Sequence, residues 1–227
     1  MAGVITALES QKRNSQRINV FIDQRFAFSL SRIVAAWLTV GQFLSDEKVE
    51  QLKQEDAIEV AMQSGLQLLS VRPRSEAELR GRLQTKGFSE TVIESVITRL
   101  RQGGLVGDAE FARMWSEQRQ ALRQKSRKVI ALELRQKGVT DEIVQEVLAE
   151  SLPDDKVAYL AGKKYLRRII HLEKSQFLQK MMGYLARRGF SYEVSRETAY
   201  RLWQEVSGGS SKSNGREELE LWDNLDG

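Results

Sequence analysis

The chain has 227 residues, of which 41% are hydrophobic and 29% charged, so it can form packed cores under a polar surface. It contains no cysteine, which excludes disulfide bonds, thiolate metal sites and cysteine nucleophiles. Neither a signal peptide nor an apolar run long enough to cross a bilayer is present, so we expect a cytoplasmic protein without a membrane contact.

The net charge of +4 averages segments of opposite sign. Residues 72–137 hold fifteen Lys/Arg against eight Asp/Glu, and residues 163–188 hold eight against one, so each segment has a net charge of +7. Residues 208–227 hold two Lys/Arg against five Asp/Glu. A basic body with an acidic tail indicates an anionic partner, of which nucleic acid is the commonest.

The first thirty residues have the pattern of β-strands. Val4–Leu8, Arg17–Ile22 and Arg25–Leu30 are short stretches with β-branched or aromatic residues, and the last two partly alternate. Residues 11–15 and the pair 23–24 are polar and suit the turns between them. The sequence therefore predicts a small antiparallel sheet of two hairpins, which should pack on a neighbouring element because it is too small to stand alone.

Helical patterns follow the sheet. Residues 31–37 predict a short helix, and Ser45 is expected to be the N-cap of another helix that runs to about Lys53. From residue 55 onward apolar residues recur at the helical period. Three longer helices, one leading each of three repeats, are expected at about 56–70, 108–124 and 154–171.

One motif recurs at a spacing of 51 residues. LQTKGFS (83–89), LRQKGVT (134–140) and LARRGFS (185–191) each contain an apolar anchor, a cation, a glycine, an apolar residue and a Ser or Thr. The glycine suits the left-handed position that ends a helix, and the Ser or Thr suits the N-cap of the next helix. Each repeat is therefore predicted to contain a helix–turn–helix. A further apolar residue, expected on the same face, stands four positions before each anchor: Leu79, Ile130 and Met181.

The predicted fold is mainly α-helical, a tandem array of three three-helix, helix-turn-helix-like repeats with a small N-terminal antiparallel β segment. The expected parts are an N-terminal extension of hairpins and a short helix (1–54), repeats at 55–104, 105–153 and 154–207, and an acidic tail (208–227). The composition of the tail favours a linker and a disordered end. Its apolar residues leave open a short docking segment: Leu219, Leu221, Trp222 and Leu225.

The candidate catalytic groups are few. His171, the one histidine, follows a Lys/Arg-rich helix and is expected at the surface. The glycines of 103–107 and the pair Gly162-Lys163 lack the Gly-Lys-Ser/Thr of a phosphate-binding loop. These segments therefore predict no cofactor site.

Two pairs of acidic residues resemble the paired carboxylates of an active site. Asp108 and Glu110, and likewise Asp154 and Asp155, fall at expected helix starts, where compensation of the helix dipole explains them better. No metal-ligand spacing is present. The sequence thus predicts no catalytic, metal-binding or cofactor-binding residue, and we expect a binding protein and not an enzyme.

Three clusters of basic residues stand at related places in the repeats. The last cluster forms two i,i+4 pairs that repel slightly on one helix, so helix stability does not explain it. A solvated face is the alternative for any single residue, whereas the three clusters together indicate a surface for phosphates. Trp115 and Trp203 follow apolar residues at helical spacing and are expected in the core. The candidate nucleic-acid and partner-binding residues are Arg72, Arg74, Arg80, Arg82, Arg123, Lys125, Arg127, Lys128, Lys163, Lys164, Arg167 and Arg168.

Several of these segments together resemble the RecX regulatory proteins of bacteria. They are RPRSEAEL (72–79), LQTKGF (83–88), GLVGDAEFA (104–112) and LRQKGV (134–139), and LARRGF (185–190) is similar to the last repeat of that family. The resemblance covers roughly residues 55–205, and the sheet-like start is similar to the extension of longer members. It implies a protein that binds the RecA recombinase, or its filament on single-stranded DNA, and mainly inhibits ATP hydrolysis, strand exchange and co-protease activity. Such a protein would act in DNA repair, homologous recombination and the SOS response.

Two other functions stay open. A regulator that binds duplex DNA directly through its helix–turn–helix units would need base-reading residues on the second helices. The second of these helices contains Asp141, Glu142, Glu146 and Glu150, which would repel phosphate. A plain helical scaffold would show no salt-sensitive affinity for DNA. The leading hypothesis is a monomer that binds RecA and its filament, with weak electrostatic affinity for DNA.

Overall fold

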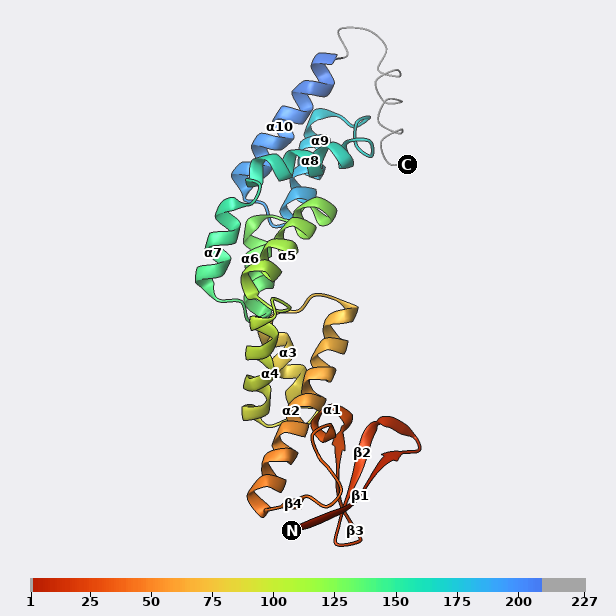
Figure 1. The fold of residues 1–227 in the computed structure, drawn as a ribbon. Helices are drawn as coiled ribbons and strands as arrows, with labels where there is room; N and C mark the ends of the chain where they lie inside the picture. The colour runs from red at the N-terminus through yellow and green to blue at the C-terminus, as the bar shows by residue number, and fades with distance from the viewer. Residues whose placement is uncertain (1, 210–227) are drawn as a thin grey trace. The chain divides into compact units, whose positions relative to one another are not determined.

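A computed structural model of the chain describes residues 2–209, and the expected acidic tail lies, from residue 210 on, outside the described residues. The chain divides into two compact units, Met1–Phe111 and Ala112–Gly227. It is mainly helical, with three three-helix repeats and an N-terminal antiparallel sheet of four strands (Figure 1). The fold class expected from the sequence is therefore confirmed.

The sheet has the strand order β3-β2-β1-β4 and is antiparallel throughout. The first three strands confirm the predicted stretches and extend them by a few residues. The fourth strand is absent from the sequence prediction because two residues are too few to show an alternating pattern. The strands are β1 (Gly3–Gln11), β2 (Asn14–Ile22), β3 (Arg25–Ser31) and β4 (Phe43–Leu44).

The helix that follows the sheet is longer than expected. After the short α1 (Arg32–Ala35), α2 (Asp46–Val71) runs for 26 residues without a break. The prediction of one helix ending near Lys53 and another starting near residue 56 is therefore wrong. No glycine or proline occurs between Ser45 and Ser64, so nothing in this stretch interrupts the backbone hydrogen bonds.

The length of α2 follows from the two cores that it serves. Val49 and Leu52 in its first half are buried against the sheet, while Ala61 in its second half is buried in the core of the first repeat. Ser45 begins the helix as predicted, because its side chain accepts a hydrogen bond from the backbone N–H of Lys48 at 3.2 Å.

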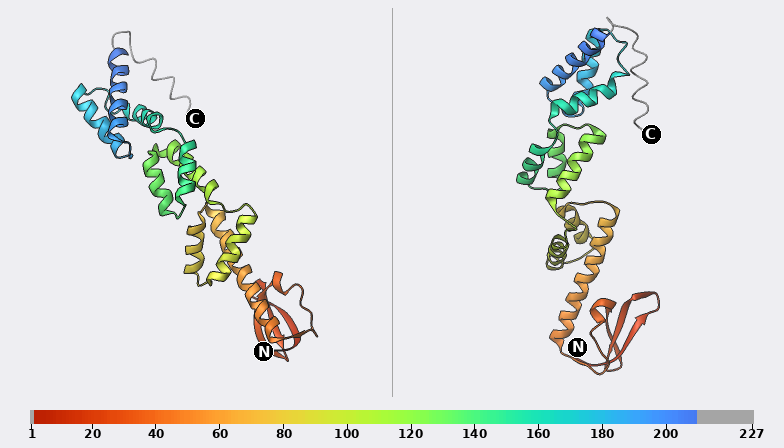
Figure 2. Two further views of the ribbon diagram at one scale, coloured as in Figure 1. Left: turned by 90° about the vertical axis from the view of Figure 1, so that its left-hand side faces the viewer. Right: turned by 45° about the horizontal axis from the view of Figure 1, so that its top comes forward.

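The repeats consist of three helices each, and Figure 2 shows them from two further sides. The second half of α2 leads the first repeat. Six apolar residues expected to share one face are 0% exposed, which confirms the register of the predicted stripes: Leu79, Leu83, Ile130, Leu134, Met181 and Leu185. The remaining helices are α3 (Glu76–Thr85), α4 (Glu90–Gln102), α5 (Asp108–Arg123), α6 (Arg127–Gln136), α7 (Asp141–Glu150), α8 (Asp154–Leu166), α9 (Lys174–Ala186) and α10 (Tyr192–Gly209).

The glycine turns have the predicted geometry in all three repeats. Gly87, Gly138 and Gly189 have φ angles of +88°, +78° and +91°. The N–H of the next residue donates to the carbonyl of the anchor leucine, with N–O distances of 3.2 to 3.4 Å. This left-handed residue with its long-range backbone bond is the Schellman end of a helix, which glycine accommodates without strain.

The residues predicted as N-caps after these turns stand at the helix starts, but not all of them make a capping hydrogen bond. Ser89, Thr140 and Ser191 precede α4, α7 and α10. Of the three, only Ser191 caps its helix through the side chain, whose Oγ accepts the backbone N–H of Val194 at 3.2 Å.

The helix α8 ends earlier than the predicted stretch 154–171. It stops at Leu166, and residues 167–172 form turns. Ile169 is 2% exposed and belongs to the core of the third repeat, so the chain leaves the helix and turns back to bury it. Arg168 is therefore not part of the helix, and the expected i,i+4 pair of Lys164 and Arg168 on one helix is wrong.

Aspartates at the starts of α5 and α8 join successive repeats. Asp108 Oδ1 accepts the backbone N–H of Glu76 at 2.9 Å, and Asp154 Oδ1 accepts that of Arg127 at 2.8 Å. Glu76 and Arg127 are the first residues of α3 and α6, whose N–H groups have no partner within their own helices. These carboxylates therefore do more than compensate the dipole of the helix in which they stand.

Candidate nucleic-acid and partner interface

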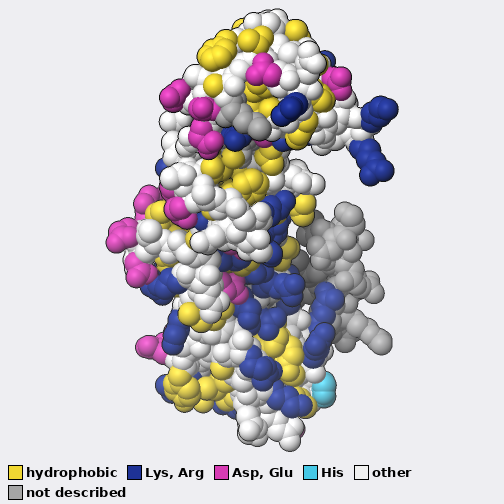
Figure 3. Space-filling model, turned by 90° about the horizontal axis from the view of Figure 1, so that it is seen from below, with side chains coloured by type: hydrophobic (Ala, Val, Ile, Leu, Met, Phe, Trp, Pro, Cys, Tyr) yellow, Lys and Arg dark blue, Asp and Glu magenta, His cyan; other side chains and the backbone are white. Residues whose placement is uncertain are grey.

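The twelve candidate cations differ in their exposure and in whether their side chains make contacts within the chain. Arg167 is exposed and Lys125 half-buried. Within residues 2–209 some of the others are held by side-chain contacts, namely Arg72, Arg74, Arg80, Arg127 and Lys163. Others are exposed and make no side-chain hydrogen bond or ion pair in this part of the chain, namely Arg82, Arg123, Lys128, Lys164 and Arg168. Figure 3 shows groups of Lys and Arg side chains on the surface, with acidic side chains gathered elsewhere.

Two arginines before α3 fix the entry to that helix. Arg72 forms a bidentate pair with Glu78, with N–O distances of 3.0 and 3.1 Å, and this hydrogen bonding raises the pKa of the arginine. Arg74 Nε donates to the carbonyl of Leu68 at 3.0 Å. Burial and the neighbouring charge of Arg72 lower the pKa of Arg74. Both side chains are thus used within the first repeat.

The carboxylate of Glu76 contacts one arginine of α3, Arg80, and one of α4, Arg101. It accepts hydrogen bonds from Arg101 at 2.6 and 2.8 Å and lies 3.6 Å from Arg80 Nη2. Hydrogen bonding to Arg101 holds the pKa of Glu76 below its ordinary value. Arg80 also pairs with Glu94. The sequence contains these ions, but their pairing depends on how the two helices cross.

Arg127 closes the end of another helix. Its Nε lies 3.2 Å from Ser151 Oγ and 3.1 Å from the carbonyl oxygen of Leu152, and its Nη2 donates to the carbonyl of Ser151. The guanidinium thus holds the chain where it leaves α7, at the C-cap Ser151 and at Leu152, whose carbonyl also accepts from Gln120 Nε2 at 2.8 Å. Arg127 therefore has a structural function.

Trp115 differs from the expected core position because its ring is only half-buried. Its indole N–H donates to Glu133 Oε2 at 2.9 Å, and Arg119 donates to the same oxygen at 2.6 Å. The cations of Arg119 and Lys137 lie 4.0 and 4.3 Å from the ring centroid. Trp203 is also half-buried and packs against the buried ring of Phe177, with the ring centroids 5.1 Å apart, so it borders the core of the third repeat and does not lie within it.

An exposed apolar segment escapes the sequence analysis. Trp37 is 89% exposed, and Ile33, Val40 and Phe43 are each more than half exposed. These four side chains fall between positions 33 and 43 of the first unit, in and after α1. Large apolar groups so exposed in one short segment are typical of a contact surface for a protein. The sequence offers no signal for it, because the same residues suit a buried short helix.

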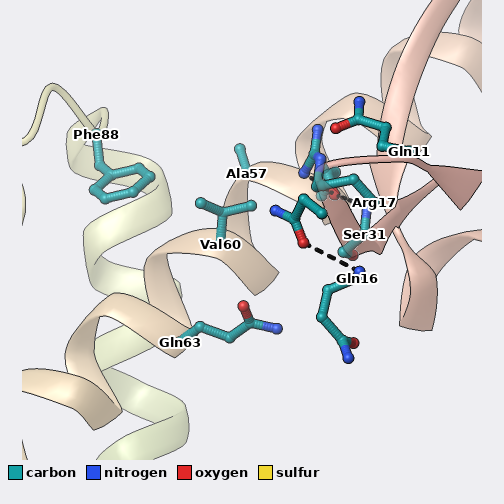
Figure 4. Close-up of a pocket in the computed structure, with 10 residues that line it drawn as sticks. Gln11, Gln16, Arg17, Ser31, Ala57, Val60, Gln63 and Phe88 are labelled. Atoms are coloured by element: carbon teal, nitrogen blue, oxygen red, sulfur yellow. Dashed lines mark hydrogen bonds and ion pairs between the residues drawn. The ribbon is translucent and has the colours of Figure 1, made fainter. Parts of the chain in front are cut away.

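A shallow groove of about 610 Å³ crosses α2 in the first unit (Figure 4). Arg17 lies at the side of the groove opposite Phe88 (Figure 4), and its Nη1 is 2.8 Å from Asp56 Oδ2, another lining residue. Ala57 and Val60 line the middle, and Phe88 stands at one side. Since its two charges neutralise each other, the groove does not add to the basic surface.

Among residues 2–209 no three His, Asp or Glu side chains are grouped so that they could hold a metal ion. No helix in that range has the length and apolar content to cross a membrane.

Models of one family match most of the chain. "Regulatory protein RecX N-terminal domain" matches residues 3–45. The first, second and third three-helix domains of RecX match residues 61–100, 108–148 and 154–199.

Curated relatives and solved structures agree. "Regulatory protein RecX" of Listeria innocua is 29% identical over 206 residues, covering 89% of this chain and 77% of the relative. The protein of the same name from Clostridium perfringens is 30% identical over 206 residues, covering 88% and 96%. A crystal structure of regulatory protein RecX matches with a TM-score of 0.67 at 24% identity, over 90% of this chain and all of that one. RecX from Lactobacillus salivarius matches with a TM-score of 0.58 at 24% identity, over 66% and 98%, and these two structures show the fold alone.

The order of the matched domains, an N-terminal domain and then three three-helix domains, is the order of the sheet and repeats described above. The matches confirm the family and the expectation of a regulatory protein that is not an enzyme. The chain belongs to the RecX family of regulatory proteins.

Proposed function

We propose that this chain binds the RecA recombinase and its filament on single-stranded DNA, and that it lowers the ATPase, strand-exchange and co-protease activities of RecA. The observation that carries this proposal is the match to four RecX models, which cover separate ranges between residues 3 and 199. The protein would act by occupying the filament, in keeping with the regulatory proteins that it resembles.

The exposed side chains are of two kinds, cations that suit phosphates and apolar groups that suit a protein surface. Lys164 and Arg168 in the second unit, and Arg82 in the first, have no carboxylate partner in the described part of the chain, so their charge is available to phosphates. The exposed side chains of Trp37 and Phe43 suit a protein surface instead. We therefore assign the free cations to DNA and segment 33–43 to the recombinase.

Reading of duplex DNA by the helix–turn–helix units is the weaker alternative. Such reading would place α7 of the second repeat in a groove lined with phosphates. Glu146 and Glu150 of α7 are exposed, and their carboxylates lie 3.8 and 3.9 Å from Arg113. Arg135 Nε also pairs with Asp141 Oδ1 at 2.5 Å. The two arginines balance only part of the charge of α7, because Glu142 is exposed on the same helix. A footprint at one preferred duplex sequence would support this alternative.

For this function we propose that the chain is organised in five parts. They are an N-terminal extension (1–54), repeats at 55–104, 105–153 and 154–207, and an acidic tail (208–227). We propose that the chain acts as a monomer in the cytoplasm, where the recombinase and its DNA are found. Linked repeats would strengthen weak individual contacts, since each one raises the effective concentration for the next.

The test is the single-strand-dependent ATPase of the cognate RecA. The chain should lower it at amounts below one molecule per recombinase subunit, because one occupied site affects its neighbours in the filament. Trp37→Ala should weaken this inhibition while affinity for single-stranded DNA stays unchanged, and Lys164→Gln should lower the DNA affinity. No change in ATPase and in filament length with the unmodified chain would rule the proposal out.

A further inference from the structure

The exposed face of α8 carries cations around one leucine. Leu160 is 52% exposed. At positions i−4, i+3, i+4 and i+7 from it lie exposed cations: Lys156, Lys163, Lys164 and Arg167. These spacings place Leu160 and the three lysines on one side of α8, and Arg167 follows at the C-cap of the helix. Lys156 and Lys164 have no hydrogen bond or ion pair within the described residues, so this face suits an acidic ligand with apolar groups.

The opposite face of α8 explains why the cations point outward. It is buried against α9 and α10 in the core of the third repeat and comprises Val157, Ala158, Ala161 and Gly162. A Cβ on Gly162 would lie 2.4 Å from Leu202 Cδ1 of α10, so the glycine permits close packing of the two helices. The orientation of α8 is thereby fixed, and its charged face stays at the surface.

The chain itself contains a segment with the complementary chemistry. Residues 217–226 read EELELWDNLD, with five carboxylates, four large apolar side chains and no cation. We propose that residues 217–226 dock on this face of α8 in the same molecule. The carboxylates would pair with Lys156 and Lys164, and a leucine or Trp222 would cover Leu160.

The end of α10 places this segment within reach. Glu205 Oε2 accepts a hydrogen bond from Tyr159 Oη of α8 at 3.0 Å and lies 3.3 Å from Lys163 Nζ. The helix α10 ends at Gly209, only one turn beyond Glu205. The residues 210–216 that follow can span up to about 24 Å. A helix with its side chains is about 10–12 Å across, so residue 217 can reach the outer face of α8.

The contact would be reversible. Exposed ion pairs are each worth only about 0.2–1 kcal/mol and are screened by salt. A short tether compensates, because it holds the segment at an effective concentration in the millimolar range. A polyanion with many phosphates could still displace it. The segment therefore acts as a built-in competitor that lowers affinity for nucleic acid and weakens as salt rises.

The test compares full-length chains. One variant neutralises the segment without shortening it, by Glu217→Gln, Glu218→Gln, Glu220→Gln, Asp223→Asn and Asp226→Asn. It should bind a fluorescein-labelled oligothymidylate about threefold to tenfold more tightly at low salt, as expected for loss of a tethered competitor. This gain should vanish in a chain that also carries Lys156→Glu and Lys164→Glu.

The control reverses two other cations of the same repeat, Lys180→Glu and Arg187→Glu, which change the net charge equally. Both residues are exposed on or just after α9. In that background the gain from neutralising the segment should persist. An equal gain in both backgrounds would mean long-range repulsion of DNA by the tail, and the docking proposal would be wrong.

A second measurement needs neither DNA nor recombinase. Backbone amide chemical shifts of the unmodified chain and of the neutralised variant should differ along α8, around Leu160 and Lys164. They should converge as salt is added. Unchanged shifts in α8 would overturn the docking proposal and leave recombinase regulation untouched, so the two failures can be told apart.

Discussion

The glycines of the three repeat turns share a backbone conformation but not a packing environment. A Cβ added at Gly87 would meet nothing within 4 Å. One added at Gly189 would overlap Val129 and Ser126 at the start of α6, where the N–H of Ser126 also donates to the carbonyl of Arg188 at 3.1 Å. The third turn is therefore a docking point within the second unit, and glycine is needed there for space as well as for its φ angle.

This difference predicts unequal costs for the same substitution. Gly87→Ala should lower the free energy of unfolding by about 1 kcal/mol, which is the cost of a left-handed alanine. Gly189→Ala should lower it by about 1–3 kcal/mol more, because Val129 or the turn must move. Denaturant unfolding of both variants measures the difference. Equal costs would mean that the contact with Val129 yields without strain.

At the scale of whole helices, the aspartates at the start of α8 distinguish two roles for an acidic residue in a first turn. One role is compensation of the helix dipole, and the other is a hydrogen bond to a neighbouring helix. Asp154 and Asp155 both stand in the first turn of α8, so compensation of the dipole would make them equivalent. Only Asp154 also accepts the N–H of Arg127, at 2.8 Å, and thereby ties α8 to the start of α6.

Asp154→Ala should therefore destabilise the chain by about 1–2 kcal/mol, since it leaves a helix N–H without its acceptor. Asp155→Ala is the matched control. It should cost no more than about 0.5 kcal/mol, because it removes only the interaction with the dipole. Thermal unfolding of the two variants in parallel gives the comparison, and equal losses would restore the explanation by the dipole alone.

Helix ends could be predicted where they depend on residues in the same short stretch of sequence. The 51-residue recurrence of Gly87, Gly138 and Gly189 shows in the sequence because each glycine ends its own helix. The union of two expected helices into α2 depends instead on two separate cores, and β4 depends on pairing with a strand about forty residues earlier. Such elements are set by tertiary contacts, which a local pattern does not contain.

The same limit applies to the candidate surface. Basic clusters are visible in the sequence, but the partner of Arg127 is the end of a helix 24 residues later, and that of Lys163 is Glu205 on α10. The sequence therefore predicts where cations gather and not which of them are free. The exposure of Trp37 is hidden for the same reason, because an apolar residue shows its burial only in the folded chain.

For the molecule as a whole, the salt dependence of DNA binding counts the cations that meet phosphates. Each neutralised phosphate of a single strand contributes about 0.7 to the slope of log affinity against log salt. Lys163 and Lys164 are neighbours on α8 with the same charge, but the Nζ of Lys163 lies 3.3 Å from Glu205. Lys164 has no such carboxylate among residues 2–209. If the proposed DNA contact is correct, the two lysines should contribute unequally.

Lys164→Gln should reduce the slope by about 0.7, measured with labelled oligothymidylate over a range of salt concentrations. Lys163→Gln should change it less, because Glu205 already offsets that charge. Glu205 keeps its bonds to Tyr159 and Arg201 in this variant, so the fold around it stays intact. If neither variant changes the slope, phosphates do not contact these two lysines of α8, and the cations that bind DNA must be sought among Arg82, Arg123, Lys128 and Arg168.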